Sequence, residues 1–151
     1  MTCNCDTTSE IYTIETVLGT AVTFMARLMS GSTAVLQADV STIKLYVYDT
    51  LGSLPTTSIT APLSLTVSTS IYDTLQTDDP DWIDSLGYNF KYTLADDVLV
   101  TSTTYRVEIV ADLVTPGEVV QLYNVITGDR ITPQGQGPLL ALNDQSLLQL
   151  D

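Results

Sequence analysis

The stretch YRVEIVADLVTPGEVVQLYNVIT, residues 105–127, decides the fold of this chain. In its first half apolar and polar side chains alternate, which is the pattern of a strand with one buried face. The apolar set is Tyr105, Val107, Ile109, Ala111 and Leu113. The turn-forming residues TPGE at 115–118 follow, and VVQLYNVIT continues as a second extended segment. Because alternation on both sides of a Pro-Gly turn is typical of a β-hairpin, we expect an antiparallel strand pair here.

The same period of two recurs in four segments upstream of this hairpin. These segments are AVTFMARLM (21–29), IKLYVYD (43–49), LSLTV (63–67) and YNFKYTL (88–94). Their predicted inward residues are Val22, Phe24, Ala26, Leu28, Ile43, Leu45, Val47, Leu63, Leu65, Val67, Tyr88, Phe90, Tyr92 and Leu94. AVLQADV (34–40) instead predicts a short helical crossing that buries Leu36 and Val40. We find no helix long enough for the crossover of a parallel β-α-β unit.

Six or seven strands are expected between residues 11 and 127, and the fold class is therefore all-β. Two packed antiparallel sheets, an immunoglobulin-like β-sandwich, is the architecture that this pattern favours. A closed barrel is the alternative. The chain lacks the Cys–Trp–Cys core signature, so the likeness to immunoglobulins concerns shape only. Residues 11–127 form the predicted sandwich domain, flanked by extended arms at 1–10 and 128–151.

The C-terminal arm combines a polar spacer with a leucine-rich end. GDRITPQGQGP (128–138) is built of turn-forming residues, and LLALNDQSLLQLD follows it. Its candidate interface residues are Leu139, Leu140, Leu142, Leu147, Leu148 and Leu150. They spread too widely around a helical wheel for a clean amphipathic face, so a helix and an extended arm both remain open. Six leucines are expected to be buried, either on their own sandwich or on a neighbouring subunit. The polar spacer favours the neighbour.

The charge of the chain points to proteins as partners. Eighteen acidic residues stand against five basic ones, for a net charge of −13. This field repels phosphate backbones and anionic lipids, so we expect no direct nucleic-acid partner and no membrane partner. The sequence also has no apolar run of about 20 residues, the length that a spanning helix requires.

Catalytic chemistry is not expected, and we predict no catalytic residues. The chain has no histidine, the usual general base at neutral pH. It also has neither a Gly-x-Ser-x-Gly elbow nor a glycine-rich phosphate loop. Cys3 and Cys5 are poorly spaced for an unstrained disulfide and too few for a tetrahedral zinc site. We expect two reduced thiols, with an intersubunit metal site or cross-link as the alternative.

The stretch SIYDTLQTDDPDWIDSLGYNF (70–90) surrounds the only tryptophan, Trp82, with aspartates. Asp78, Asp79, Asp81 and Asp84 are a candidate calcium cluster. Their spacing differs from that of an EF-hand, so we predict a solvated loop whose aspartates cap turns, with no metal and no cofactor. Trp82 is predicted to be largely buried, as a lid over one open end of the sandwich. Tyr46 and Tyr48 face outward and form either a contact surface or a face that another segment covers.

The order of segments resembles small β-sandwich proteins encoded among the virion structural genes of tailed bacteriophages. The segments that carry the resemblance are GTAVTFMARL, STIKLYVYD, IYDTLQTDDPDW, GYNFKYTL, TTYRVEIVADL and VVQLYNV. They span about residues 18–127 and neither arm. More loosely, the chain resembles the N-terminal sandwich of baseplate proteins that hold receptor-binding proteins. The resemblance implies that Trp82 plugs the sandwich while Tyr88 and Phe90 begin a core strand.

Assembly into a virion is the function that this resemblance implies. We expect a capsid decoration (cement) protein on the outer surface of the head, acting as a symmetric homo-oligomer on the major capsid protein. A neck, tail or baseplate adaptor that contacts other virion proteins is the first alternative. A carbohydrate- or receptor-binding module, with Trp82 and the exposed tyrosines as its platform, is the second. Clustered exposed aromatic residues favour that last alternative, whereas clean burial of Trp82 counts against it.

Overall fold

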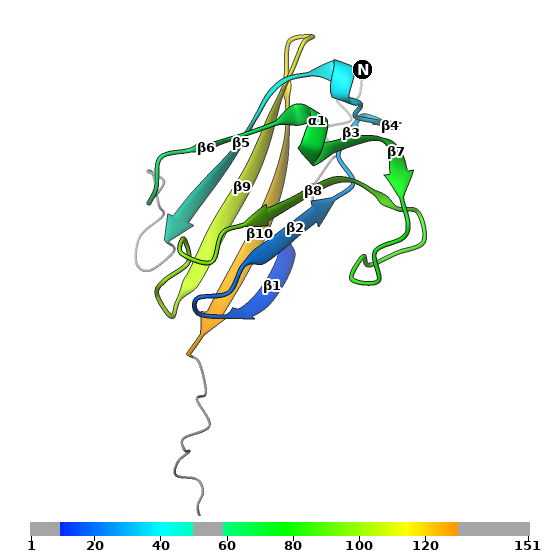
Figure 1. Ribbon diagram of the computed structural model, residues 1–151. Helices are drawn as coiled ribbons and strands as arrows, with labels where there is room; N and C mark the ends of the chain where they lie inside the picture. The colour runs from blue at the N-terminus through cyan, green and yellow to red at the C-terminus, as the bar shows by residue number, and fades with distance from the viewer. Residues whose placement is uncertain (1–9, 50–58, 130–151) are drawn as a thin grey trace, which may run out of the picture.

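The computed structural model describes residues 10–49 and 59–129, and these residues form a β-sandwich (Figure 1). One sheet has five strands in the order β1-β10-β9-β5-β6. Their bounds are β1 Tyr12–Val17, β10 Glu118–Gly128, β9 Thr104–Leu113, β5 Val40–Asp49 and β6 Leu63–Leu65. The second sheet has the order β2-β8-β7. Its strands are β2 Val22–Ala26, β8 Tyr88–Leu94 and β7 Ile71–Gln76. The predicted all-β sandwich is thereby confirmed.

Short elements complete the described part of the chain. β3 Met29–Ser30 and β4 Thr33–Ala34 form a two-stranded ribbon, and α1 Val67–Ser70 is a single helical turn. The expected number of six or seven strands is too low. The sequences of β1, β7 and this ribbon have no long apolar alternation from which a strand could be predicted. None of the helices among the described residues has the length and apolar character needed to cross a membrane.

The hairpin predicted from residues 105–127 is present as β9 and β10. The two strands pair antiparallel, with Val110 opposite Val120 and Val107 opposite Tyr123. Leu113 N–H donates to the Gly117 carbonyl at 3.0 Å and closes the turn between them. β1 then joins the free side of β10 in parallel, with Tyr12 opposite Tyr123. The hairpin is therefore the centre of the larger sheet, with β5 on one side and β1 on the other.

The core lies between the two sheets and is filled by the predicted alternating residues. Those that are buried are Val22, Phe24, Ala26, Leu28, Ile43, Leu45, Val47, Tyr88, Phe90, Leu94, Tyr105, Val107, Ile109 and Ala111. Leu63, Leu65, Val67, Tyr92 and Leu113 are only partly buried and pack against this core. Burial of these side chains is the main force that holds the sheets together.

The prediction for residues 34–40 is wrong for one of its two residues. Val40 is buried, but Leu36 remains 39 % exposed. The reason is that the helical segment shrinks to a three-residue 3₁₀ turn at Gln37–Asp39, and Leu36 precedes it. Leu36 N–H donates to the Asp39 carboxylate at 2.9 Å, so its backbone caps the turn.

Most of the expected arms lie outside the described residues. This holds for Cys3 and Cys5 and for all six candidate interface leucines, Leu139, Leu140, Leu142, Leu147, Leu148 and Leu150. Of residues 128–151, only Gly128 and Asp129 are described. Gly128 ends β10 beside the end of β1, where its carbonyl accepts from Leu18 N–H at 3.0 Å.

Candidate binding groove between β1 and β2

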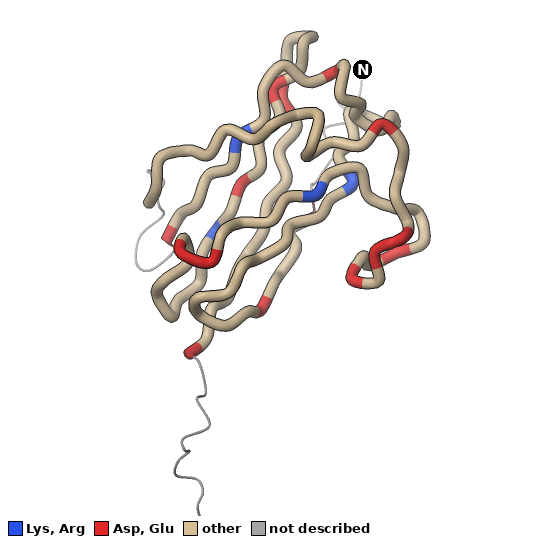
Figure 2. Tube along the Cα trace, in the orientation of Figure 1, with Lys and Arg blue, Asp and Glu red and all other residues tan. Residues whose placement is uncertain are grey.

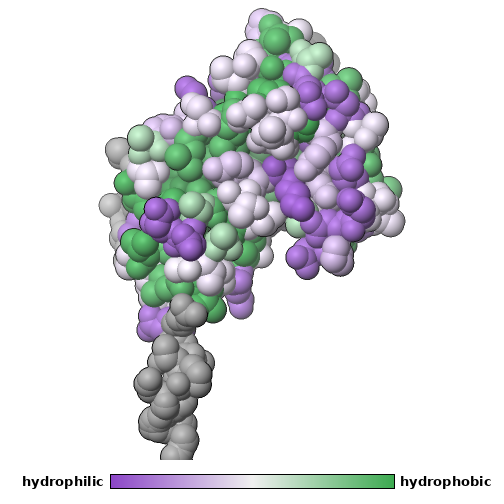
Figure 3. Space-filling model, viewed as in Figure 1, coloured by the Kyte–Doolittle hydropathy of each residue, from purple (hydrophilic) through white to green (hydrophobic). Residues whose placement is uncertain are grey.

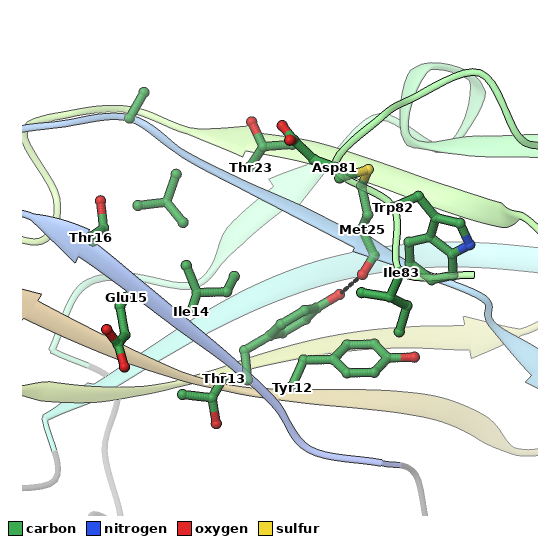
Figure 4. Close-up of a pocket in the computed structure, with 13 residues that line it drawn as sticks. Tyr12, Thr13, Ile14, Glu15, Thr16, Thr23, Met25, Asp81, Trp82 and Ile83 are labelled. Atoms are coloured by element: carbon green, nitrogen blue, oxygen red, sulfur yellow. Dashed lines mark hydrogen bonds between the residues drawn. The ribbon is translucent and has the colours of Figure 1, made fainter. Parts of the chain in front are cut away.

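A hollow lies where the two sheets of the described structure leave an edge open. β1 ends one sheet and β2 ends the other, and a short turn joins them in the chain. Between them lies a groove of about 500 Å³ (Figure 4). Its lining residues are Tyr12, Thr13, Ile14, Glu15, Thr16, Ala21, Val22, Thr23, Met25, Asp81, Trp82, Ile83 and Tyr123. We call this site the β1–β2 groove.

Tyr123 of β10 ties the two sheets together beneath the groove. Its hydroxyl donates to the Met25 carbonyl of β2 at 2.8 Å (Figure 4). Its ring lies 4.8 Å from that of Phe24 and 5.8 Å from that of Tyr12, measured between centroids. Burial raises the pKa of Tyr123 well above its usual value, so the phenol stays neutral and remains a donor. This link holds the open edge at a constant width.

Trp82 forms one wall of the groove with its indole ring partly exposed. The ring packs edge-to-face on Tyr12 at 6.4 Å and tilts against Tyr88 at 5.5 Å. Ile83 beside it is 66 % exposed. These side chains present apolar surface to solvent, which is the usual character of a binding site.

Polar groups line the rim of the groove. Asp81 projects at the rim from the loop between β7 and β8 and is exposed. Glu15 is also exposed, but its side chain points to the face of β1 opposite to Ile14, away from the groove (Figure 4). Thr16 and Thr23 contribute hydroxyl groups, which also bond to Thr20 at 2.8 Å and to Thr93 at 2.9 Å. The groove is therefore apolar along its walls, with the Asp81 carboxylate at its rim and no basic side chain among its lining residues.

The wall that carries Trp82 is held in place by Asp84. Its carboxylate accepts two hydrogen bonds from the Arg27 guanidinium, each of 3.0 Å. Oδ1 also accepts from the Trp82 indole at 2.9 Å and from Gly87 N–H at 3.1 Å. Arg27, ahead of the other donors, holds the pKa of Asp84 well below its usual value. Arg27 also lies 5.9 Å from the Trp82 ring centroid, within cation–π range.

Three of the four aspartates of the candidate calcium cluster are each bound to a different partner. Asp79 forms an ion pair with Lys91 at 2.8 Å, which lowers the pKa of this carboxyl. Asp78 accepts from the Tyr88 hydroxyl at 3.2 Å, and Asp84 is bound to Arg27. Figure 2 shows these acidic residues along the loop beside two basic positions. Within residues 10–49 and 59–129, no three acidic side chains are grouped closely enough to hold a metal ion.

The structure places the three residues of the predicted plug in two elements, with Trp82 in contact with Tyr88. Tyr88 and Phe90 lie in β8 and are buried, at 3 % and 0 % exposure. Trp82 lies outside that strand, in the loop, and is only partly buried at the open edge between β1 and β2. Its emission is therefore available as a reporter of the β1–β2 groove.

Sequence reasoning overlooked two residues of GYNF that organise this region. Asn89 is 1 % exposed, although its position in the alternation pointed outward. Its side chain bonds to Leu28 N–H at 2.6 Å, to the Leu28 carbonyl at 3.0 Å and to the Val35 carbonyl at 2.8 Å. Gly87 adopts φ +99°, and a Cβ atom there would lie 2.7 Å from the Gln76 carbonyl. The sequence hints at these two roles only by placing an Asn between two core aromatic residues shortly after a Gly.

Tyr46 and Tyr48 lie apart from this groove, on β5 of the five-stranded sheet. Their rings are parallel within 6°, with centroids 6.4 Å apart, and both residues are partly exposed. Burial and the nearby Glu108 carboxylate raise the pKa of Tyr48. This tyrosine pair and the Tyr12–Trp82 pair are therefore on separate surfaces of the described structure.

Comparisons with known proteins give no further guidance to the function. No protein-family model matches the chain, and no curated protein matches its sequence.

Proposed function

We propose that this protein is a non-enzymatic structural protein of a tailed-phage particle, specifically a capsid decoration protein that stabilises the head through contacts between subunits. One observation carries the proposal. Among the described strands, β1 and β2 each end a sheet and lie side by side around an apolar groove, and β10 ends beside that groove where the C-terminal arm begins. Such an arrangement equips a domain to join its neighbours by strand addition.

The chemistry of the groove supports a binding role over a catalytic one. Its lining residues with polar side chains are threonines, tyrosines and two exposed acidic residues, and the whole chain has no histidine. A threonine nucleophile needs a base within hydrogen-bond distance, and the hydroxyls of Thr16 and Thr23 bond to other threonines. The groove therefore offers shape and apolar surface, which suit a protein partner.

The distribution of charge and hydropathy supports a protein partner as well. Acidic residues recur around the loops and ends of the sandwich (Figure 2). In Figure 3, hydrophilic side chains gather over the loop between β7 and β8, whereas apolar ones gather toward β5 and β6. The partners we propose are the major capsid protein or other virion proteins together with further copies of this chain. An acidic outer surface keeps particles dispersed and free of nucleic acid.

Purified particles of the phage whose genome encodes this chain provide the test. We expect mass spectrometry to detect the protein and electron microscopy to locate it on the outside of the head, in stoichiometry with the capsid lattice. Density on the neck, tail or baseplate instead would support the adaptor alternative. Absence of the protein from the particles would refute both virion roles.

A carbohydrate-binding module is the second candidate, and one observation favours it. Tyr12 and Trp82 present partly exposed rings in the groove beside the Asp81 carboxylate, a combination that suits stacking on a sugar ring and bonding to its hydroxyls. Titration with a panel of oligosaccharides, followed by Trp82 emission, tests this candidate. Saturable binding that Trp82→Ala abolishes and Tyr46→Ala leaves unchanged would support it over the assembly role.

A further inference from the structure

We propose that the β1–β2 groove is the acceptor site for residues 139–142 (LLAL) of a second copy of this chain, which enter the groove as an added β-strand. This inference rests on the proposed assembly function and names the contact by which copies join. The arm supplies an apolar sequence, and the groove, among the described residues, supplies an open strand edge and an apolar wall.

The open edge of β2 is identified by the direction of its backbone groups. Leu28 bonds through its N–H and its carbonyl to Asn89 of β8, which lies on the paired side of β2. The Met25 carbonyl is instead bound by Tyr123 from the groove side. In an antiparallel ladder the backbone groups of alternate residues point to opposite sides. Thr23 therefore shares the direction of Met25, and its N–H and carbonyl face the groove.

The groove matches the side-chain pattern of the segment. Leu140 and Leu142 are two residues apart, so in a strand both point to the same side. Ile14, Val22, Met25 and Ile83 line the groove and provide apolar surface for them. LLAL carries no charge, so the carboxylate at the rim does not oppose its entry.

The position of the arm favours a second copy over the same chain. Gly128 lies at the end of the groove nearest Thr16 and Ala21, because it pairs with Val17 and its carbonyl bonds to Leu18. Residues 130–138 reach at most about 30 Å when extended. The spacer is polar and contains Gly135 and Gly137, the composition of a linker that reaches a neighbouring subunit. To reach the groove of a neighbouring copy within that distance, the arm does not have to reverse its direction.

The full-length chain is tested with two pairs of matched variants, one pair in the groove and one in the arm. Thr23→Pro removes the N–H that faces the groove, and a proline is tolerated at such a position on an edge strand. Thr23→Val loses the same hydroxyl contact to Thr93 but keeps the N–H. Leu140→Asp places a charge in the segment, whereas Asn143→Asp adds the same charge just outside it.

We expect Thr23→Pro and Leu140→Asp to weaken self-association by at least about tenfold in sedimentation equilibrium, the change that loss of one good contact produces. Thr23→Val and Asn143→Asp should associate as the wild type does. Near-ultraviolet circular dichroism and melting verify that each variant is folded. Should Thr23→Pro fail to fold, amide hydrogen exchange of wild type and Leu140→Asp takes its place. The Thr23 amide is then expected to be protected only in the wild-type assembly. A wild-type protein that is monomeric at all concentrations would overturn the proposal.

A photo-crosslinker at position 142, in a mixture of isotopically light and heavy chains, identifies the occupant. Mixed light–heavy products that join position 142 to β1, β2 or the Trp82 loop would support the proposal. Products confined to a single chain, or joined to a site outside the groove, would overturn it. If residues 139–142 of one copy cross-link to the groove of another but the protein is absent from purified particles, the proposed function alone would be refuted. Particles that carry the protein with its grooves empty would refute this inference alone.

Discussion

The guanidinium of Arg27 and the carboxylate of Asp84 face each other through two hydrogen bonds of 3.0 Å, from two segments 57 residues apart in the chain. The same carboxylate accepts from the Trp82 indole and from the backbone N–H groups of Leu86 and Gly87. One ion pair therefore joins the end of β2 to the loop before β8 and orients the ring that forms a wall of the β1–β2 groove. Bidentate pairing of this kind is more specific than a contact between point charges.

This pair predicts a particular response to acid. Because the pKa of Asp84 is lowered in the folded protein, its contribution to stability is fully present above the unfolded pKa, about 3.9, and is lost as the pH falls below it. Asp84→Asn should lower the melting temperature at pH 7 and flatten its decline in acid. Melting curves between about pH 2 and 7 measure this, with Asp81→Asn as the control from the same loop. An unchanged acid slope in Asp84→Asn would contradict the assigned role.

Trp82 should contribute less to stability than a fully enclosed aromatic residue. Its ring is partly exposed and packs on Tyr12 and Tyr88, so we expect Trp82→Ala to cost about 2 kcal/mol, below the 3–5 kcal/mol typical of core aromatic residues. Ile83→Ala, at a more exposed neighbour, should stay within about 0.5 kcal/mol of wild type. Urea unfolding measures both. A cost of 4 kcal/mol or more, on the order of a full core truncation, would indicate that Trp82 is enclosed in solution.

Gly87 is required by both its backbone angle and its surroundings. We expect Gly87→Ala to destabilise the fold by about 2–3 kcal/mol, because a methyl group at φ +99° is strained and would lie 2.7 Å from the Gln76 carbonyl. Gly19→Ala isolates the conformational part, since Gly19 has φ +73° and no atom within 4 Å of its added Cβ. That control should cost about 1 kcal/mol. Equal losses in the two variants would mean that the contact with Gln76 relaxes freely.

Asn89 should be the most sensitive polar residue of the described sandwich. Its amide makes three buried hydrogen bonds to the backbone of Leu28 and Val35. Asn89→Ala removes the partner of the Leu28 N–H and of the Val35 carbonyl, whereas the Leu28 carbonyl still accepts from the Val35 N–H, so we expect a loss of about 3 kcal/mol. The matched control is Asn124→Ala, on the partly exposed side of β10, where the side-chain oxygen accepts a hydrogen bond from the Arg106 guanidinium. Its cost should be within about 1 kcal/mol. Similar chemical denaturation midpoints for the two variants would refute the role of Asn89.

The sequence by itself determined the fold class and most of the core. Alternation in 21–29, 43–49, 88–94 and 105–127 identified the strands and their buried faces, because a strand with one face in a core must repeat every two residues. Local pattern failed where the backbone bends: Leu36 stays exposed beside a shortened turn, and Asn89 is buried against the period. Asn89 is held inside by hydrogen bonds to Leu28 on a neighbouring segment, whereas the backbone of Leu36 bonds to Asp39 within its own turn.

Only the tertiary structure decided where the candidate site lies. The β1–β2 groove forms because β1 pairs in parallel with β10 in one sheet while β2 ends the other, and no local pattern specifies which strands are left at an edge. The same holds for the aspartates around Trp82, which look like one cluster in the sequence. Pairing with Arg27, Lys91 and Tyr88 separates them, because each carboxylate is stabilised most by the donor that the fold brings within reach. Composition and periodicity report what is buried, whereas long-range pairing decides which surfaces remain open.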